Sequence, residues 1–116
     1  KLQQLNYSMF SKNTFNRYER ILKGNISSES EDDISSSGYV VSTLEAVMWL
    51  FLNSNDYNST ILKAVNLGND TDTIAAITGS LLGIYYGLDS INDKWRLSLK
   101  KYDYIIDLCE KFKEIL

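Results

Sequence analysis

The sequence predicts an all-α protein, a helical bundle, from three observations. The chain of 116 residues contains no proline, so no proline ring interrupts its helices. Apolar residues recur at spacings of three and four along most of the chain, as they do on the buried side of a helix. No stretch shows the alternation that is typical of a strand. With 44% apolar and 23% charged residues, the composition is that of a globular domain.

The N-terminal part is expected to form a helical hairpin over residues 1–24. A short helix is predicted over 2–10 and a second over 14–23, where apolar residues follow helical spacing. Gly24 stands where a left-handed C-terminal cap ends such a helix. Residues 25–38 are rich in serine and acidic side chains and are predicted to form a mobile loop.

Residues 39–116 are expected to form the helical core. Ser42 and Glu45 have the spacing of a capping box, in which two side chains satisfy free amide groups at the start of a helix. The run 46–52 that follows is apolar on all sides. This helix is therefore predicted to be central and covered by neighbours all round.

Two further helices are predicted over 57–66 and 70–86, with a break at 67–69. Their expected buried stripes are Ile61, Leu62 and Val65 in the first helix, and Ile74, Ile77, Leu81 and Ile84 in the second. The second helix also carries a face of small residues. Because glycine inside a helix costs about 1 kcal/mol relative to alanine, Gly79 and Gly83 suggest that another backbone packs unusually close to this face.

Gly87 is expected to end that helix, and residues 88–93 to form a loop. A helical stretch is predicted over 95–100 and a last amphipathic helix over 102–115. The buried face of the last helix should contain Ile105, Leu108, Phe112 and Ile115. Cys109, on the same helix, is expected to be buried or half-buried.

Composition excludes several classes of chemistry. Because the chain has no histidine, it has no histidine base, triad or metal ligand. Its single cysteine, Cys109, cannot form an internal disulfide, which suits a reducing compartment. The net charge of −3 gives no general attraction to nucleic acid or to anionic membranes, and no apolar run approaches the about 20 residues of a membrane span. We therefore expect a cytoplasmic protein that binds neither.

The most informative stretch is Gly68-Asn-Asp-Thr-Asp-Thr73, which places two carboxylates and two hydroxyls at the start of a helix. One interpretation is helix capping, in which these oxygens accept from free backbone amides. The other is a site for a hard cation, Mg²⁺ or Mn²⁺, held by Asp70, Asp72 and Thr73. A single turn supplies too few ligands for such an ion, so the rest must come from another segment, the substrate or water.

A family resemblance favours the second interpretation. Residues 64–87, around Gly-Asn-Asp-Thr-Asp-Thr, closely resemble the C-terminal signature of the ADP-ribosylglycohydrolases, a family that includes the enzyme acting on dinitrogenase reductase. Residues 37–52 resemble the block that precedes this signature, and Ile91-Asn-Asp-Lys-Trp95 is similar to its usual Ile-Pro-x-x-Trp. Asn69 stands at the family's second glycine, and Asn92 at its proline, where it should loosen the following helix.

The resemblance implies the C-terminal portion of an all-α fold with a paired-metal centre, usually of Mg²⁺ and sometimes of Mn²⁺. Family members hydrolyse the bond between ADP-ribose and an acceptor, often arginine. By correspondence, Asp70 and Asp72 would be carboxylate ligands and Thr73 a hydroxyl ligand. No catalytic residue is assigned.

Three residues are candidates for contact with the substrate: Gly38, Tyr39 and Asn69. Tyr39 stands beside Gly38 at a helix entry and is suited to line a nucleotide pocket. Packing of its ring over the helix start is the alternative, and it is the more common role for such a residue. The expected ligand is ADP-ribose or an ADP-ribosylated protein.

The main departure from the family is the lack of its N-terminal half, which carries a Ser/Thr-Asp-Asp motif with further metal ligands and an acidic catalytic residue. The nearest match, Ser30-Glu-Asp-Asp33, is interpreted as a solvated acidic loop. The chain also starts at Lys1 without a methionine. We therefore expect the C-terminal fragment of an ADP-ribosylglycohydrolase, incomplete and inactive alone, with a complementing N-terminal chain as one partner.

An alternative function remains open at this point. The chain is then a non-enzymatic relic of the fold that self-associates or binds ADP-ribose without cleaving it. The helix over 46–52, stripped of its neighbours, would expose apolar surface, and exposed apolar surface favours association. A homo-oligomer is expected if the chain stands alone.

Overall fold

A computed structural model describes residues 12–115 and shows an all-helical chain over that range, which confirms the predicted fold class. In chain order the elements are α1 (Lys12–Arg17), α2 (Glu19–Leu22), η2 (Ile26–Ser28), η3 (Glu31–Asp33), α3 (Val40–Leu52), α4 (Tyr57–Asn66), α5 (Thr71–Tyr86), η4 (Leu88–Ser90), α6 (Asp93–Ser98) and α7 (Tyr102–Lys113). The helix predicted over 2–10, and with it the N-terminal hairpin, lies outside the described residues. The helix predicted over 14–23 is interrupted at Tyr18 and forms α1 and α2.

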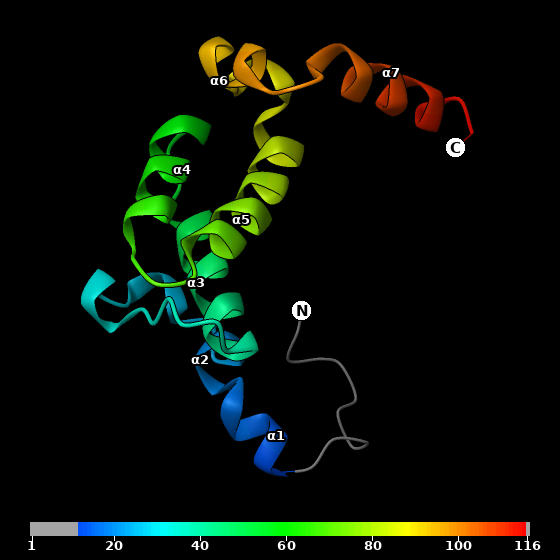
Figure 1. The fold of residues 1–116 in the computed structure, drawn as a ribbon. Coiled ribbons are helices and arrows are strands. Elements are labelled where there is room, and N and C mark those ends of the chain that lie inside the picture. Colours follow the sequence, from blue (N-terminus) through cyan, green and yellow to red (C-terminus); the bar gives the residue numbers. More distant parts are fainter. Residues whose placement is uncertain (1–11, 116) are drawn as a thin grey trace.

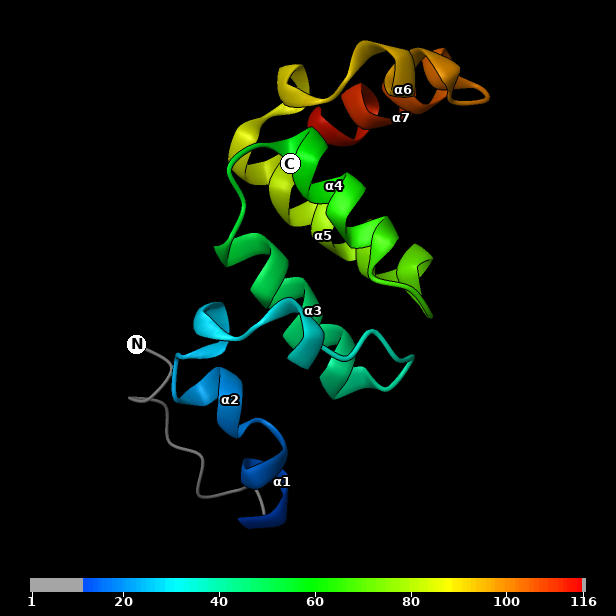
Figure 2. The same cartoon turned by 90° about the vertical axis from the view of Figure 1, so that its left-hand side faces the viewer.

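Helices α3, α4 and α5 form the centre of the fold (Figures 1 and 2). Helices α4 and α5 are joined by residues 67–70 and pack against each other as an antiparallel hairpin. Helix α3 lies beside α5 and runs in the same direction. Gly38 lies against Asp70 at one end of this pair, and the Phe51 ring lies against the Tyr85 ring at the other, with 5.6 Å between ring centroids.

The side chains of α3 confirm its central position but not its complete coverage. Ala46, Val47 and Leu50 are buried. Leu52 is 51% exposed, however, and Met48 is only partly buried, so one side of the helix is uncovered. The prediction that this apolar run is covered all round is therefore wrong for that side.

The predicted capping box does not form. Helix α3 begins at Val40, before Ser42, and Tyr39 at its N-cap position makes no side-chain cap. Glu45 lies inside the helix, where only 8% of its surface is exposed, and its carboxylate pairs with Arg20 of α2 at 3.2 Å. An ion pair across 25 residues of sequence takes the place of the local motif.

Within the predicted loop over 25–38, two apolar residues and the short helix η2 pack on α3. Ile26 and Ile34 are part of the hydrophobic core, and η2 lies against α3. The indole Nε1 of Trp49 donates a hydrogen bond to the carbonyl oxygen of Glu29 at 2.9 Å. The acidic residues of η3 are exposed, as predicted for them.

The bounds of α4 and α5 agree with the prediction to within one residue, but their buried faces differ from it. Leu62 and Val65 of α4 and Ile77 and Ile84 of α5 are exposed. The buried residues are Thr60 and Ala64 in α4, and Ile74, Thr78 and Leu82 in α5. Ile74 is buried as predicted, and Ile61 and Leu81 are partly buried, so the apolar stripes mark the buried surfaces only in part.

One of the two helical glycines in α5 explains the close packing of the hairpin. A Cβ atom at Gly79 would lie 3.2 Å from the Tyr57 hydroxyl and 3.3 Å from Cδ1 of Ile61, both on α4. The close neighbours are side chains rather than the predicted backbone. At Gly83 nothing lies within 4 Å, so the prediction of close packing is wrong there.

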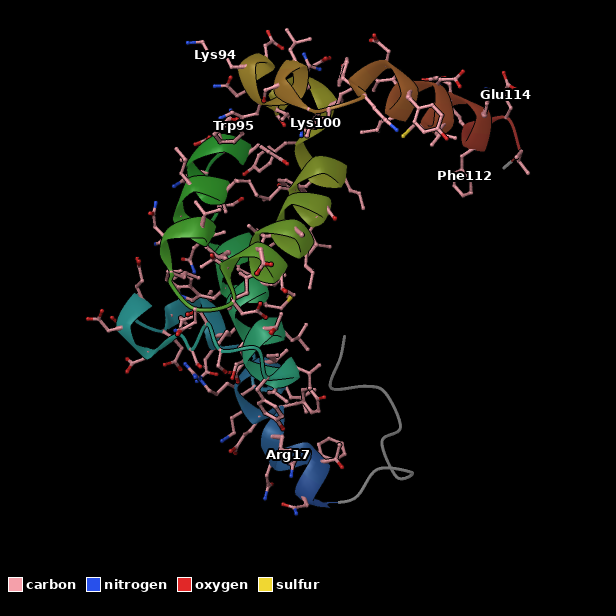
Figure 3. All side chains as sticks on the ribbon, viewed as in Figure 1. Arg17, Lys94, Trp95, Lys100, Phe112 and Glu114 are labelled. Carbon is pink, nitrogen blue, oxygen red and sulfur yellow. The ribbon has the colours of Figure 1, made fainter. Side chains whose placement is uncertain are left out.

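Helices α6 and α7 extend away from the core (Figure 1). The Asn92 side chain caps α6 by accepting a hydrogen bond from the Lys94 amide at 2.9 Å, so this residue does not loosen the helix start. The predicted buried face of α7 is exposed, and the side chain of Phe112 projects from the helix (Figure 3). Cys109 is exposed as well. No described helix combines the length and apolar character needed to cross a bilayer.

Candidate functional site

The turn between α4 and α5 has an unusual backbone. Gly68 and Asn69 are consecutive residues with positive φ, at 84° and 57°. Glycine adopts this left-handed region without a steric penalty, and asparagine tolerates it better than most residues. The turn ends α4 and places Asp70 directly before the first residue of α5.

A buried serine from a distant segment fixes this turn. The hydroxyl of Ser36 donates to the carbonyl oxygen of Leu67 at 3.2 Å and accepts from Nδ2 of Asn69 at 3.2 Å. The carbonyl oxygen of Ser36 accepts from the Asp70 amide at 3.1 Å. Sequence reasoning missed Ser36, because it stands in a serine-rich run without a distinguishing pattern.

The carboxylate of Asp70 is held by a side chain and not by the helix backbone. Its Oδ1 accepts a hydrogen bond from Oγ1 of Thr73 at 3.0 Å, and it accepts no amide at the start of α5. The capping interpretation is therefore wrong for Asp70. Asp72 is exposed in the first turn of the same helix. We call Asp70, Asp72 and Thr73 the half-site.

The predicted substrate contacts divide into two groups. Gly38 and Asn69 lie next to the half-site: a Cβ atom at Gly38 would be 3.4 Å from Oδ2 of Asp70. Tyr39 is half-exposed, and its hydroxyl accepts a hydrogen bond from Nη1 of Arg17 at 3.0 Å. The hydroxyl of Tyr39 thus joins α1 to the start of α3. Substrate contact by these residues stays a prediction.

The oxygen atoms of the half-site suit a hard cation. Mg²⁺ binds oxygen ligands at 2.0–2.1 Å in an octahedron, so two adjacent ligands lie about 3.0 Å apart. The 3.0 Å between Thr73 Oγ1 and Asp70 Oδ1 is the length of their hydrogen bond, and it is also compatible with this separation. No group of three or more acidic, cysteine or histidine side chains suited to a metal occurs among residues 12–115. The half-site therefore offers part of a coordination sphere.

The acidic segment Ser30-Glu-Asp-Asp33 is not part of the half-site. Its three acidic residues form η3 and are exposed. Glu31 pairs with Lys63 of α4 at 3.1 Å. The structure agrees with the interpretation of this segment as a solvated charge run.

Comparisons with known proteins identify the family of this chain. The sequence model of the ADP-ribosylglycohydrolase family matches residues 2–116. An ADP-ribosylarginine hydrolase, Tri1 of Serratia proteamaculans, is 41% identical over 88 residues, which are 76% of this chain and 24% of the relative. Tri1 of Pseudomonas putida is 46% identical over 72 residues, 62% of this chain and 19% of the relative.

A third relative is named for the protein from which it removes ADP-ribose. The ADP-ribosyl-[dinitrogen reductase] glycohydrolase of Rhodospirillum rubrum is 35% identical over 72 residues, which are 62% of this chain and 24% of the relative. In each of these three comparisons the matched part is about a quarter of the relative's length or less. The chain belongs to the ADP-ribosylglycohydrolase family.

Proposed function

We propose that this chain supplies one part of the metal centre of an ADP-ribosylarginine hydrolase, and that the complete protein removes ADP-ribose from arginine side chains. The family match and the names of the two Tri1 relatives support the reaction and the acceptor. One observation carries the metal part: the Asp70 carboxylate and the Thr73 hydroxyl lie 3.0 Å apart, and that carboxylate is not used as a helix cap.

In this proposal each residue of the half-site has a role. Asp70 and Asp72 hold Mg²⁺ or Mn²⁺ through their carboxylates, and Thr73 through its hydroxyl oxygen. Two carboxylates are needed because the start of α5 carries the positive end of the helix dipole and by itself repels a cation. Gly38 lies against the Asp70 carboxylate. A bound ion supplies Lewis acidity and a fixed attachment for ribose hydroxyls or water.

The chain alone is expected to be inactive. The half-site offers three side-chain oxygen donors, whereas Mg²⁺ takes six ligands. Several waters are usual around Mg²⁺, so weak binding to the isolated chain is still expected. Hydrolysis should require the part of the domain that this chain does not span, which the matched segment leaves as about three quarters of the Serratia relative.

Ion binding is tested by thermal melts with Mg²⁺ or Mn²⁺, each with and without ADP-ribose. Ligand at 100 times its dissociation constant should stabilise the fold by about 2.7 kcal/mol, or roughly 10 °C. The double variant Asp70→Asn with Asp72→Asn should lose this shift. Asp32→Asn with Asp33→Asn, which removes the same charge from η3, should keep it. Equal behaviour of the two double variants would contradict the assignment.

Hydrolysis is tested in a chimera, in which the matched residues of this chain replace their counterpart in the Serratia relative. The substrate is a protein ADP-ribosylated on arginine, and the released ADP-ribose is measured. The chimera should be active, and its Asp70→Asn, Asp72→Asn form should not. An active double variant would refute the role of the half-site.

A further inference from the structure

An uncharged apolar surface runs along the paired helices α3 and α5. Its members occupy one side of each helix and are the exposed Val40, Leu44, Ile77, Ile84 and Tyr85, with the partly buried Met48, Phe51 and Leu81. Ile84 is 85% exposed and Tyr85 is 69% exposed. We call this surface the α3–α5 face.

The two stripes of this face lie on the same side of the helix pair. The apolar residues of the face stand at positions 40, 44, 48 and 51 of α3 and at positions 77, 81 and 84 of α5. Spacings of three and four place the residues of each set on one side of their helix. Contact between the Phe51 and Tyr85 rings joins the two stripes at the C-terminal end. Helix α4 packs elsewhere on α5, against Gly79, and leaves this side open.

Charge is almost absent from both helices. Glu45 is the one charged residue of α3, and it pairs with Arg20 away from this face. Asp72 is the one charged residue of α5, and it belongs to the half-site. Soluble proteins rarely leave an apolar surface of this extent uncovered, so such a surface marks an interaction site.

The face starts at the half-site. Thr73 and Ile77 are four residues apart on α5, so they are neighbours on the same side of the helix. Gly38 lies against Asp70 and is followed by the N-cap residue of α3, after which Val40 begins the other stripe. A segment that covers this face is therefore in position to approach the half-site.

We propose that the α3–α5 face is the docking surface for the rest of an ADP-ribosylglycohydrolase domain, the part that this chain does not span. Two observations select this occupant. The face is uncharged like the interior of a domain, and about three quarters of the Serratia relative lies outside the matched segment. That the docked part also brings the missing ligands rests on the proposed function; the docking itself does not.

The test compares the isolated chain with the chimera, by thermal melts in EDTA so that no metal contributes. Leu44→Asp and Ile84→Asp place a charge on the face. Leu62→Asp is the matched control, because Leu62 is 51% exposed inside α4 and Leu44 is 41% exposed inside α3. In the isolated chain all three variants should melt within about 3 °C of the parent, as surface changes usually do.

In the chimera the two face variants should melt at least about 5 °C below the parent, because the charge is buried there, whereas the control should not. Equal effects in the chain and the chimera, or an equal loss in the control, would overturn the proposal. A chimera that is a dimer and becomes a monomer with Ile84→Asp would show a second copy on the face and overturn it too.

Two further comparisons separate the docking proposal from a failure of the chimera to fold and from the proposed metal role. If the chimera does not fold, the same substitutions at the aligned positions of the unaltered Serratia protein repeat the comparison. The stability readout is also independent of hydrolysis. If the face variants are destabilised in EDTA while the Asp70→Asn, Asp72→Asn chimera stays active, docking stands and the proposed metal role fails.

Discussion

Two buried threonines with opposite hydrogen-bonding states give a sharp prediction about stability. Thr78 of α5 is completely buried, and its Oγ1 has no hydrogen-bond partner among the described residues. Thr60 of α4 is also buried, but its Oγ1 donates to the carbonyl oxygen of Asp56 at 2.7 Å. Replacement by valine keeps the shape of each side chain and removes only the hydroxyl.

The expected effects have opposite signs. A buried hydroxyl without a partner costs about 1–3 kcal/mol, and a buried methyl group contributes about 0.8 kcal/mol. Thr78→Val should therefore raise the free energy of unfolding by about 1–2 kcal/mol, which is roughly 5 °C in a domain of this size. Thr60→Val should lower it by about 1 kcal/mol, because a made hydrogen bond is lost.

The assay is urea and thermal unfolding of both variants, followed by circular dichroism, with the parent measured alongside. The slope of free energy against urea should not change, since the area exposed on unfolding is the same. A destabilised Thr78→Val would show that the hydroxyl has a partner in solution. Shifts of the same sign in both variants would refute the hydrogen-bond argument.

Three further predictions concern single contacts. Arg20→Ala leaves the carboxylate of Glu45 without its ion pair and should lower the free energy of unfolding by about 1–3 kcal/mol in urea titrations, whereas Lys at position 20 should recover part of it. Gly83→Ala should raise the free energy of unfolding by up to about 1 kcal/mol, and Gly79→Ala should raise it less, because its Cβ meets a tyrosine hydroxyl of α4. Hydrogen bonds from the side chain and the amide of Ser59 lower the pKa of Asp56. The ionised Asp56 carboxylate therefore stabilises the fold above about pH 4, and this stabilisation is lost as the pH falls. Asp56→Asn should flatten this part of the profile of melting temperature against pH.

Local signals in the sequence were sufficient to place the helices that carry the site. The break at Gly68 and Asn69 and the ending at Gly87 mark the limits of α4 and α5 because these residues adopt backbone conformations that a helix does not. The capping box at Ser42 failed for the opposite reason. Glu45 finds its partner in Arg20, which is remote in sequence, and no local pattern reports such a contact.

The apolar stripe of α5 was predicted to be buried along its whole length, but only part of it is: Ile74 is buried, whereas Ile77 and Ile84 are exposed. Periodicity shows that one side of a helix avoids water, but it does not show which neighbour covers that side. Ile77 and Ile84 lie on the α3–α5 face, which nothing among residues 12–115 covers. Likewise Asp70 and Thr73 were predicted together from their spacing, whereas Ser36, which fixes their turn, depends on the tertiary fold.

The bonds of Ser36 also set an order for the assembly of this region. Asn69 and Ser36 are separated by 33 positions, so their contact requires the closure of a long loop, whereas α5 needs only local contacts to form. During refolding the helical signal should therefore return before the turn is fixed. Trp49 donates to Glu29 in the same segment as Ser36, so the fluorescence of its indole follows this slower closure. If an ion binds only when this turn is formed, as the proposed function implies, its binding also stabilises the packing of residues 25–36 on α3.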